Sequence, residues 1–264
     1  MNFGLVIVGD EILSGKRQDK HMAKVIELLG ARGLALSWVR YVGDDRDRIT
    51  ALLRDVFAGA DAVFCCGGIG ATPDDHTRQC AAAALNRPLE LHPHARALIL
   101  ERMRDVAREQ NLPYEPERPD NLHRLNMGVF PQGAEIIANP YNKIPGFSVG
   151  HVHFVPGFPV MAHPMMEWLL DTRYRSLHGT HRRVEQSVIV TGAMEATLTP
   201  LMEQVEAHFA GVKVFSLPSV DHPQWGRHIE LGVKGDAAVA QAAFTELKAG
   251  LAALGVTPRA ELVR

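Results

Sequence analysis

A glycine-rich turn followed by two carboxylates is the segment of this sequence best suited to chemistry; it reads GGIGATPDDHT at residues 67–77. Its glycines let backbone N–H groups approach an anion without obstruction from Cβ atoms. The carboxylates of Asp74 and Asp75 would repel a phosphate unless a divalent cation lay between them, and Mg²⁺ prefers such hard oxygen ligands. The turn therefore predicts a phosphate-bearing ligand with Mg²⁺ bound at Asp74 and Asp75. Its predicted ligand-binding residues are Gly67, Gly68, Gly70 and Thr72.

The two carboxylates also have a purely structural interpretation. A helix is expected to begin near Asp74 or Asp75, and a carboxylate in a first turn stabilises the N-terminal end of a helix. Capping and cation binding are both left open for each residue. His76 comes next and is either an acid–base group near neutral pH or a solvated helix residue.

Three further polar loops follow predicted strands, at residues 9–19, 139–146 and 156–159. In the first, Lys16 and Arg17 carry charge that would neutralise a phosphate, although both would serve equally as solvated loop residues. Four polar loops at strand ends argue for a binding site more strongly than any one of them. The predicted ligand-binding residues of these three loops are Gly9, Asp10, Glu11, Lys16, Asp19, Asn139, Lys143, Gly146, Pro156 and Gly157.

Apolar runs and helical periodicity alternate along residues 1–175 and must position these loops. The helix expected over 20–32 carries apolar residues at helical spacing, namely Met22, Val25, Ile26 and Leu29. The alternation predicts a three-layer α/β/α domain with a mostly parallel sheet, whose ligand lies beyond the carboxyl ends of the strands. The expected strands are 3–8, 34–42, 62–66, 135–138, 147–150 and 153–155, and the other expected helices are 46–58, 94–110 and 158–170.

The order of elements changes after a polar segment at residues 171–183, where we expect a linker. The following pattern of strand, helix, two strands, helix and strand is that of a split βαβ unit. Residues 183–264 are therefore predicted to form a smaller, ferredoxin-like α+β domain.

Composition limits the classes of partner. The 264 residues carry 28 basic and 30 acidic side chains, so the chain is not strongly basic. Binding to nucleic acid is therefore not expected. The sequence contains no run of about 18 apolar residues, so we expect no membrane span. The N-terminus lacks the pattern of a signal peptide. The three cysteines, Cys65, Cys66 and Cys80, are odd in number and indicate a reducing compartment. We therefore expect a cytoplasmic protein.

In combination and order, these motifs resemble the molybdopterin-binding domain family, and most of all the N-terminal part of its CinA-like (competence/damage-inducible) members. The second domain resembles the small middle domain of the same proteins through residues 215–219 and 229–235. By position, Asp75 matches the aspartate that closes the family's GGxGxTxxD motif. Asp44 or Asp45 matches its other acidic position. The resemblance therefore implies four candidate catalytic residues, namely Asp44, Asp45, Asp74 and Asp75.

The resemblance implies two activities that the sequence leaves open. One is metal-dependent hydrolysis of a nucleotide pyrophosphate linkage, as in ADP-ribose or FAD. The other is binding or adenylylation of molybdopterin. A non-catalytic sensor is a third hypothesis, because Asn142-Lys143-Ile144 stands where CinA-like proteins usually have Gly-Thr-Ala.

The resemblance also implies a homodimer. The apolar segment at 161–170 could form part of a dimer interface, but packing in the core would explain it equally well. Because the sequence stops at Arg264 without the C-terminal domain of CinA, we expect no nicotinamide mononucleotide deamidase activity.

Overall fold

The computed structural model describes residues 1–179 and 183–263. The chain forms two compact units, Met1–His178 and Gly179–Arg264, and each is described by itself. Of the segment expected as a linker, residues 171 and 172 complete helix α7 (Pro159–Thr172) and residues 180–182 lie outside the described part.

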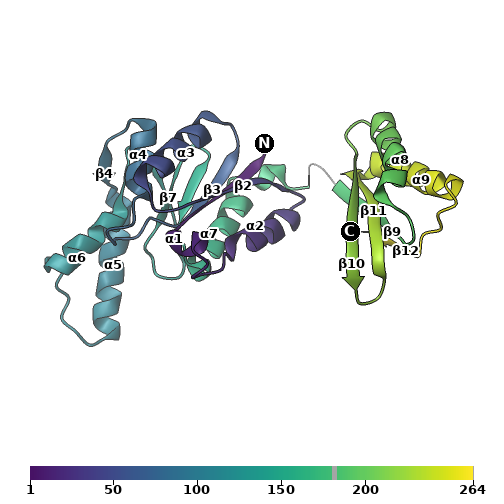
Figure 1. The fold of residues 1–264 in the computed structure, drawn as a ribbon. Coiled ribbons are helices and arrows are strands. Elements are labelled where there is room, and N and C mark those ends of the chain that lie inside the picture. Colours follow the sequence, from purple (N-terminus) through teal and green to yellow (C-terminus); the bar gives the residue numbers. More distant parts are fainter. Residues whose placement is uncertain (180–182, 264) are drawn as a thin grey trace. The chain divides into compact units, whose positions relative to one another are not determined.

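The first unit, the N-terminal part of the ribbon in Figure 1, is built around a central sheet. This sheet has six strands in the order β2-β1-β3-β8-β7-β6. The first four strands are parallel, and the last two run antiparallel to their neighbours. A mostly parallel sheet was predicted, and the structure confirms it. The strands span Leu36–Val42 (β2), Phe3–Val8 (β1), Ala62–Cys66 (β3), Val152–Val155 (β8), Gly146–Val149 (β7) and Glu135–Ile137 (β6).

Helices cover both faces of this sheet. Every residue of β1 and β3 is buried, as expected for central strands covered on both sides. Because successive strand residues point to opposite faces, Cys65 packs in one hydrophobic core and Cys66 in the other. The core that holds Cys65 includes α3 (Arg46–Ala58) and α4 (Thr77–Leu85); the core that holds Cys66 includes α2 (His21–Gly30) and α7. The first unit is thus the predicted three-layer α/β/α domain.

The remaining elements of the first unit are short or peripheral. A single turn of helix, α1 (Asp10–Leu13), follows β1. The others are β4 (Leu89–Leu91), α5 (Pro93–Glu109), α6 (Pro119–Arg124), the 3-10 helices η1 (Leu125–Gly128) and η2 (Arg175–Leu177), and β5 (Val129–Pro131), which pairs with β4.

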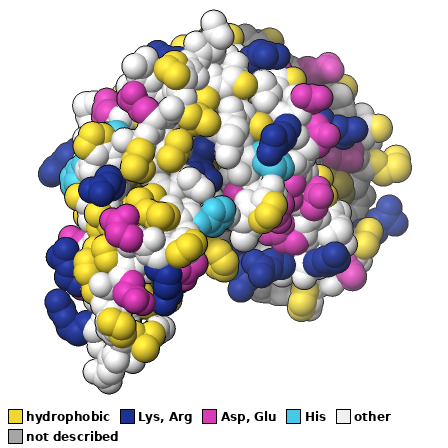
Figure 2. Space-filling view, turned by 90° about the vertical axis from the view of Figure 1, so that its left-hand side faces the viewer, with side chains coloured by type: hydrophobic (Ala, Val, Ile, Leu, Met, Phe, Trp, Pro, Cys, Tyr) yellow, Lys and Arg dark blue, Asp and Glu magenta, His cyan; other side chains and the backbone are white. Residues whose placement is uncertain are grey.

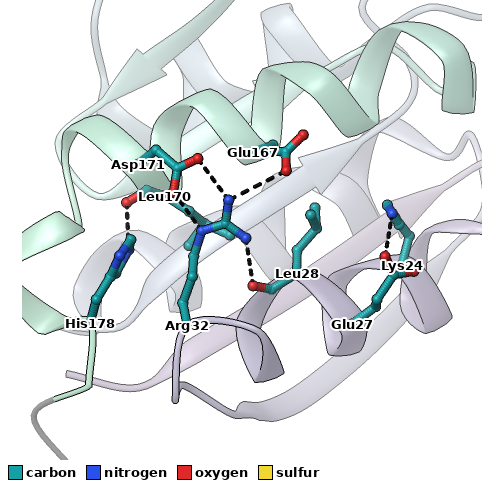
Figure 3. A network of polar contacts seen from close by, with 8 residues as sticks. All are labelled: Lys24, Glu27, Leu28, Arg32, Glu167, Leu170, Asp171 and His178. Atoms are coloured by element: carbon teal, nitrogen blue, oxygen red, sulfur yellow. Dashed lines mark hydrogen bonds and ion pairs between the residues drawn. The ribbon is translucent and has the colours of Figure 1, made fainter.

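An ion-pair network joins α2 to α7 (Figure 3). The guanidinium of Arg32 donates through Nε and Nη2 to the two carboxylate oxygens of Asp171, at 2.6 and 2.7 Å. Its Nη1 donates to the carbonyl oxygen of Leu28 at 2.8 Å, and Glu167 lies 3.4 Å from Nη2. This bidentate contact raises the pKa of Arg32 and lowers that of Asp171. The network fixes two helices whose N-terminal ends follow two of the predicted loops.

Two expectations about helices were wrong. The buried face of α2 is formed by His21, Val25, Leu28 and Leu29, whereas Met22 and Ile26 are 39% and 48% exposed. Both faces of this helix carry apolar residues, so periodicity alone did not select between them. Helix α4 begins at Thr77 and not near Asp74 or Asp75, because Asp75 is engaged in a turn with Thr72.

The apolar segment at 161–170 belongs mainly to the core of the first unit. Met165, Met166, Leu169 and Leu170 are buried there, while Trp168 is 45% exposed. Core packing therefore explains most of the segment, and the homodimer stays a prediction.

The second unit has the predicted order of elements. Its sheet follows the order β10-β11-β9-β12 with every pair antiparallel, which is the split βαβ arrangement of a ferredoxin-like domain. Both helices contribute to one hydrophobic core. The elements span Arg183–Val190 (β9), Glu195–His208 (α8), Lys213–His222 (β10), Gly226–Asp236 (β11), Ala237–Ala253 (α9) and Ala260–Val263 (β12).

The surface mixes side chains of different kinds. On the face drawn in Figure 2, acidic, basic and hydrophobic side chains are interspersed. None of the described helices is long and apolar enough to cross a membrane.

Candidate functional site

Three loops that leave the carboxyl ends of β1, β3 and β8 line one cleft of about 550 Å³, which we call the glycine cleft. The three strands are adjacent and parallel, so their loops leave the same edge of the sheet. Asp44, which follows β2, completes the lining. The cleft brings together the predicted residues Gly9, Glu11, Asp44, Gly67, Gly68, Gly70, Thr72, Asp74, Asp75, Pro156 and Gly157.

The glycine turn after β3 adopts a backbone that favours glycine. Gly67 and Gly68 have φ values of 105° and 68°. A Cβ at Gly67 would overlap the carbonyl oxygen of Val8, and one at Gly68 would overlap the Thr77 hydroxyl. The buried Thr77 fixes the turn, since its hydroxyl donates to the Gly67 carbonyl at 3.0 Å and its N–H donates to the Gly68 carbonyl at 2.9 Å.

Asp75 closes the second half of this turn. Its Oδ2 accepts hydrogen bonds from the N–H and the hydroxyl of Thr72, at 2.9 and 2.6 Å. The carboxylate also lies against Gly70, where an added Cβ would be 2.5 Å from Oδ2. Asp75 is therefore a turn-forming group and not the N-cap of α4, which corrects the capping interpretation. Its Oδ1 accepts no hydrogen bond from the described residues.

The turns after β1 and β2 are joined by two aspartates. The N–H of Asp10 donates to Oδ2 of Asp44 at 2.9 Å, and the N–H of Asp44 donates to Oδ1 of Asp10 at 3.2 Å. Burial raises the pKa of Asp44; the negative charges of Asp10, Glu11 and Asp74 raise it further, against the lowering effect of the Asp10 N–H. Of these two aspartates, Asp44 lines the cleft and Asp10 does not.

The acidic side of the cleft has the donor chemistry for a hard cation. Carboxylate repulsion around Asp44 would be relieved by a divalent ion, and the donors are all oxygen. Within residues 1–179 and 183–263, no three His, Cys, Asp or Glu side chains are close enough together to hold a metal ion. The residues therefore fit an ion held by one or two carboxylates and completed by ligand phosphates and water, as Mg²⁺ commonly is.

The positive charge at the cleft comes from Arg17, although of the two basic residues considered only Lys16 was named among the predicted ligand-binding residues. The structure places Arg17 in the lining of the cleft and Lys16 outside it. The chain folds back after α1, and this turn is held by a hydrogen bond from the N–H of Arg17 to the Glu11 carbonyl at 2.9 Å. The guanidinium lies 5.9 Å from the centre of the Phe158 ring, and this ring, 54% exposed, also lines the cleft. Phe158 was missed, although an aromatic residue between Gly157 and Pro159 is a signal for an exposed ring at a strand end.

Asp19 and Asp45 stabilise helix starts. Asp45 accepts a hydrogen bond from the Arg48 N–H at 2.8 Å and is the N-cap of α3. The carboxylate of Asp19 accepts from the N–H groups of His21 and Met22, at 2.7 and 3.1 Å. Asp19 also lines a separate cavity of about 340 Å³, which shares Glu11, Arg17 and Phe158 with the glycine cleft.

The loop at 139–146 lies away from the glycine cleft. It follows β6, which is the edge strand and is two positions from β8, so the loop leaves the sheet at a distance from the other loops. Asn139 is buried and bonds within the loop, to Asn142 at 2.8 Å and to the Ile144 carbonyl at 3.0 Å. Lys143 pairs with Glu101 and Asp105, both at 2.6 Å. A Cβ at Gly146 would overlap the Phe154 carbonyl oxygen, so packing explains that glycine.

Comparison with protein families identifies the first unit. Residues 4–176 match the family described as "Probable molybdopterin binding domain". The match covers more than half of the 264-residue chain. The chain belongs to the molybdopterin-binding domain family. The glycine cleft lies wholly within this molybdopterin-binding domain.

Relatives of the chain include CinA-like proteins, as the motifs predicted. The chain is 35% identical over 175 residues to a CinA-like protein of Anaeromyxobacter dehalogenans (strain 2CP-1 / ATCC BAA-258), covering 64% of this chain and 40% of that protein. A CinA-like protein of Syntrophotalea carbinolica is 30% identical over 220 residues, covering 79% of this chain and 51% of that protein. The chain thus spans about half, or less, of the length of these relatives.

A solved structure supports the same fold. The protein CinA from Thermoplasma acidophilum, described as having unknown function, matches with a TM-score of 0.54 and 26% sequence identity. The match covers 65% of this chain and 98% of that one.

Proposed function

We propose that the glycine cleft binds the phosphate groups of a nucleotide and that the chain hydrolyses a pyrophosphate linkage there with the help of a divalent cation. One observation carries this proposal: a single cleft combines a glycine turn, the cation Arg17 and the carboxylates of Asp44, Asp74 and Asp75. A phosphoanhydride needs both halves of this arrangement, because its oxygens are negative and its hydrolysis requires activated water.

The roles divide between the two sides of the cleft. On one side, the glycine turn and Arg17 would hold the phosphate oxygens, with N–H donors and a guanidinium. On the other, Asp44 and Asp74 would hold the cation, while Asp75 fixes the shape of the turn through Thr72. When bound, the cation would neutralise phosphate charge and lower the pKa of a bound water. The exposed ring of Phe158 would stack on a base or other flat ring at the cleft.

Turnover by the purified chain tests the proposal. ADP-ribose, FAD and a dinucleoside polyphosphate would each be incubated with Mg²⁺, Mn²⁺ or Co²⁺, and released phosphate compounds would be separated by chromatography. We expect metal-dependent cleavage of at least one substrate, abolished by a chelator. Absence of cleavage in every combination by a folded preparation would refute hydrolysis.

Binding or adenylylation of molybdopterin is the second candidate function. The family match over residues 4–176 favours it, because that family is described as molybdopterin-binding. The same glycine turn would hold the single phosphate of the pterin. Calorimetric titration with molybdopterin and with ADP-ribose separates the candidates, since a submicromolar preference for the pterin would favour the second.

A further inference from the structure

A second cavity, of about 330 Å³, lies on the other side of the turn that ends in Asp75. We call it the basic pocket. It shares Ala71, Thr72 and Asp75 with the glycine cleft, so this turn forms a wall between the two. The charged and titratable residues of its lining are Arg46, Asp75, His76, Arg78 and His123.

Arg78 is buried and forms no ion pair with any of the described residues. Only 3% of the residue is exposed, and its Nη2 donates to the Gly70 carbonyl at 2.5 Å. Its Nε has no hydrogen-bond partner, and no carboxylate of the described residues forms an ion pair with it. Burial lowers the pKa of Arg78, and the charge of Asp75 offsets only part of that effect. A buried cation with an unpaired donor is unfavourable unless something negative completes it.

The rest of the pocket supplies only part of that negative charge. Its one carboxylate, Asp75, directs Oδ2 to Thr72. The lining also includes Arg46, the first residue of α3, and His76, the residue before α4. Two helices of 13 and nine residues therefore begin at the pocket, and the N-terminal end of a helix favours an anion. His123 donates from Nε2 to the Ala71 carbonyl at 2.8 Å, so this nitrogen carries the proton.

We propose that the basic pocket is a binding site for a phosphoryl group, held by the guanidinium groups of Arg46 and Arg78. The group is either free phosphate or the outer phosphate of a ligand that is bound in the glycine cleft and extends past Thr72 into the basic pocket. Because Arg78 is bonded to the Gly70 carbonyl, an anion at Arg78 also acts on the turn that lines the glycine cleft. The site does not depend on hydrolysis, so it stands or falls separately from the proposed function.

Titration of inorganic phosphate into the full chain, followed by calorimetry, tests the site. The variants are Arg46→Ala and Arg78→Lys. The matched control is Arg48→Ala, on the same helix but outside the pocket. We expect the Kd for phosphate to rise at least tenfold in the two test variants and to stay within about twofold of wild type in the control.

Two results would overturn the site: no saturable phosphate binding by wild type, or unchanged binding in Arg46→Ala. Thermal unfolding checks that each variant is folded. If Arg78→Lys does not fold, Arg46→Ala decides the question alone, because Arg46 is exposed. Repeating the titration with ADP present separates the two sources of the group. Competition indicates the phosphate of a ligand, and independent binding indicates a free ion.

Discussion

Asp10 and Asp44 hold one another's backbone: each side chain accepts a hydrogen bond from the N–H of the other residue. The pair ties the turn after β1 to the turn after β2, across two neighbouring parallel strands. A Cβ at Gly43 would overlap Oδ1 of Asp10, so the glycine before Asp44 makes room for this contact. The edge of the sheet that carries the glycine cleft is thereby braced by carboxylates, two groups that would otherwise repel.

Asp44→Asn should abolish metal-dependent turnover while leaving the fold intact. The asparagine oxygen can still accept from the Asp10 N–H, but the charge that would hold a cation is gone. We expect turnover to fall at least about 100-fold, equivalent to about 2.7 kcal/mol of barrier. Asp45→Asn is the control, because Asp45 caps α3 outside the cleft and asparagine caps almost as well. Wild-type rates in Asp44→Asn would place the cation elsewhere.

Asp75→Asn should keep the chain folded, because an amide oxygen can replace the acceptor that faces Thr72. We expect metal-dependent turnover to fall by orders of magnitude in Asp74→Asn, which removes a carboxylate assigned to the cation, and to fall less in Asp75→Asn, which keeps the turn. Rates across a Mg²⁺ series and thermal unfolding measure both effects. Equal loss in the two variants would contradict the special position of Asp75 in the turn.

Arg17→Ala should weaken binding of a phosphate ligand in the glycine cleft. We expect KM for the substrate to rise about tenfold, since a charged hydrogen bond is worth about 1.5–3 kcal/mol. Lys16→Ala is the matched control, because its side chain lies outside the cleft. A larger effect in Lys16→Ala than in Arg17→Ala would reverse the assignment.

Gly67→Ala should destabilise the first unit by about 2 kcal/mol or more, because positive φ and overlap with the Val8 carbonyl act together. Gly15→Ala provides the comparison, since Gly15 also has positive φ, 72°, but no atom within 4 Å of its added Cβ. That variant should lose only about 1 kcal/mol. Urea unfolding measures both, and equal losses would show that close packing at Gly67 is unimportant.

Stability should depend on pH through the buried His153. Its Nδ1 lies 2.8 Å from the Ser148 hydroxyl and its Nε2 lies 2.6 Å from the Tyr174 hydroxyl. Burial lowers its pKa to about 3, so it stays neutral in the folded state. In the unfolded state it binds a proton near its ordinary pKa of 6.5. Its contribution to stability is therefore complete above pH 6.5 and is lost as the pH falls toward 3, at about 1.4 kcal/mol per unit.

His153→Gln isolates this effect, because glutamine keeps hydrogen-bonding groups and does not titrate. Urea unfolding at pH 7 and pH 5 should show a smaller loss of stability in the variant, by about 2 kcal/mol. Parallel pH profiles for wild type and variant would show that His153 does not carry the dependence.

Much of the fold and part of the site follow from local sequence. The turns at Gly9, Gly67 and Pro156 were predicted because loops at the carboxyl ends of parallel strands must share an edge. The position of the 139–146 loop was not predicted. Strand order is set by tertiary packing, and it places β6 at the edge of the sheet.

Other misses have equally local causes. The choice between Lys16 and Arg17 depends on how the chain turns after α1. The helix start was misplaced because Thr72 competes for the carboxylate of Asp75. Arg78 was overlooked, although it is spaced three and four residues from the buried Ala81 and Ala82, a signal for a charge on an apolar helix face.

The alternation of Cys65 and Cys66 on β3 provides two built-in probes of unfolding. Each thiol is buried in a different core, and burial raises the pKa of both, so neither forms the thiolate that reacts with alkylating agents. Labelling therefore requires the chain to open. The rate at which an alkylating reagent modifies Cys65 reports on exposure of the core under α3 and α4. The rate for the next residue, Cys66, reports on exposure of the core under α2 and α7.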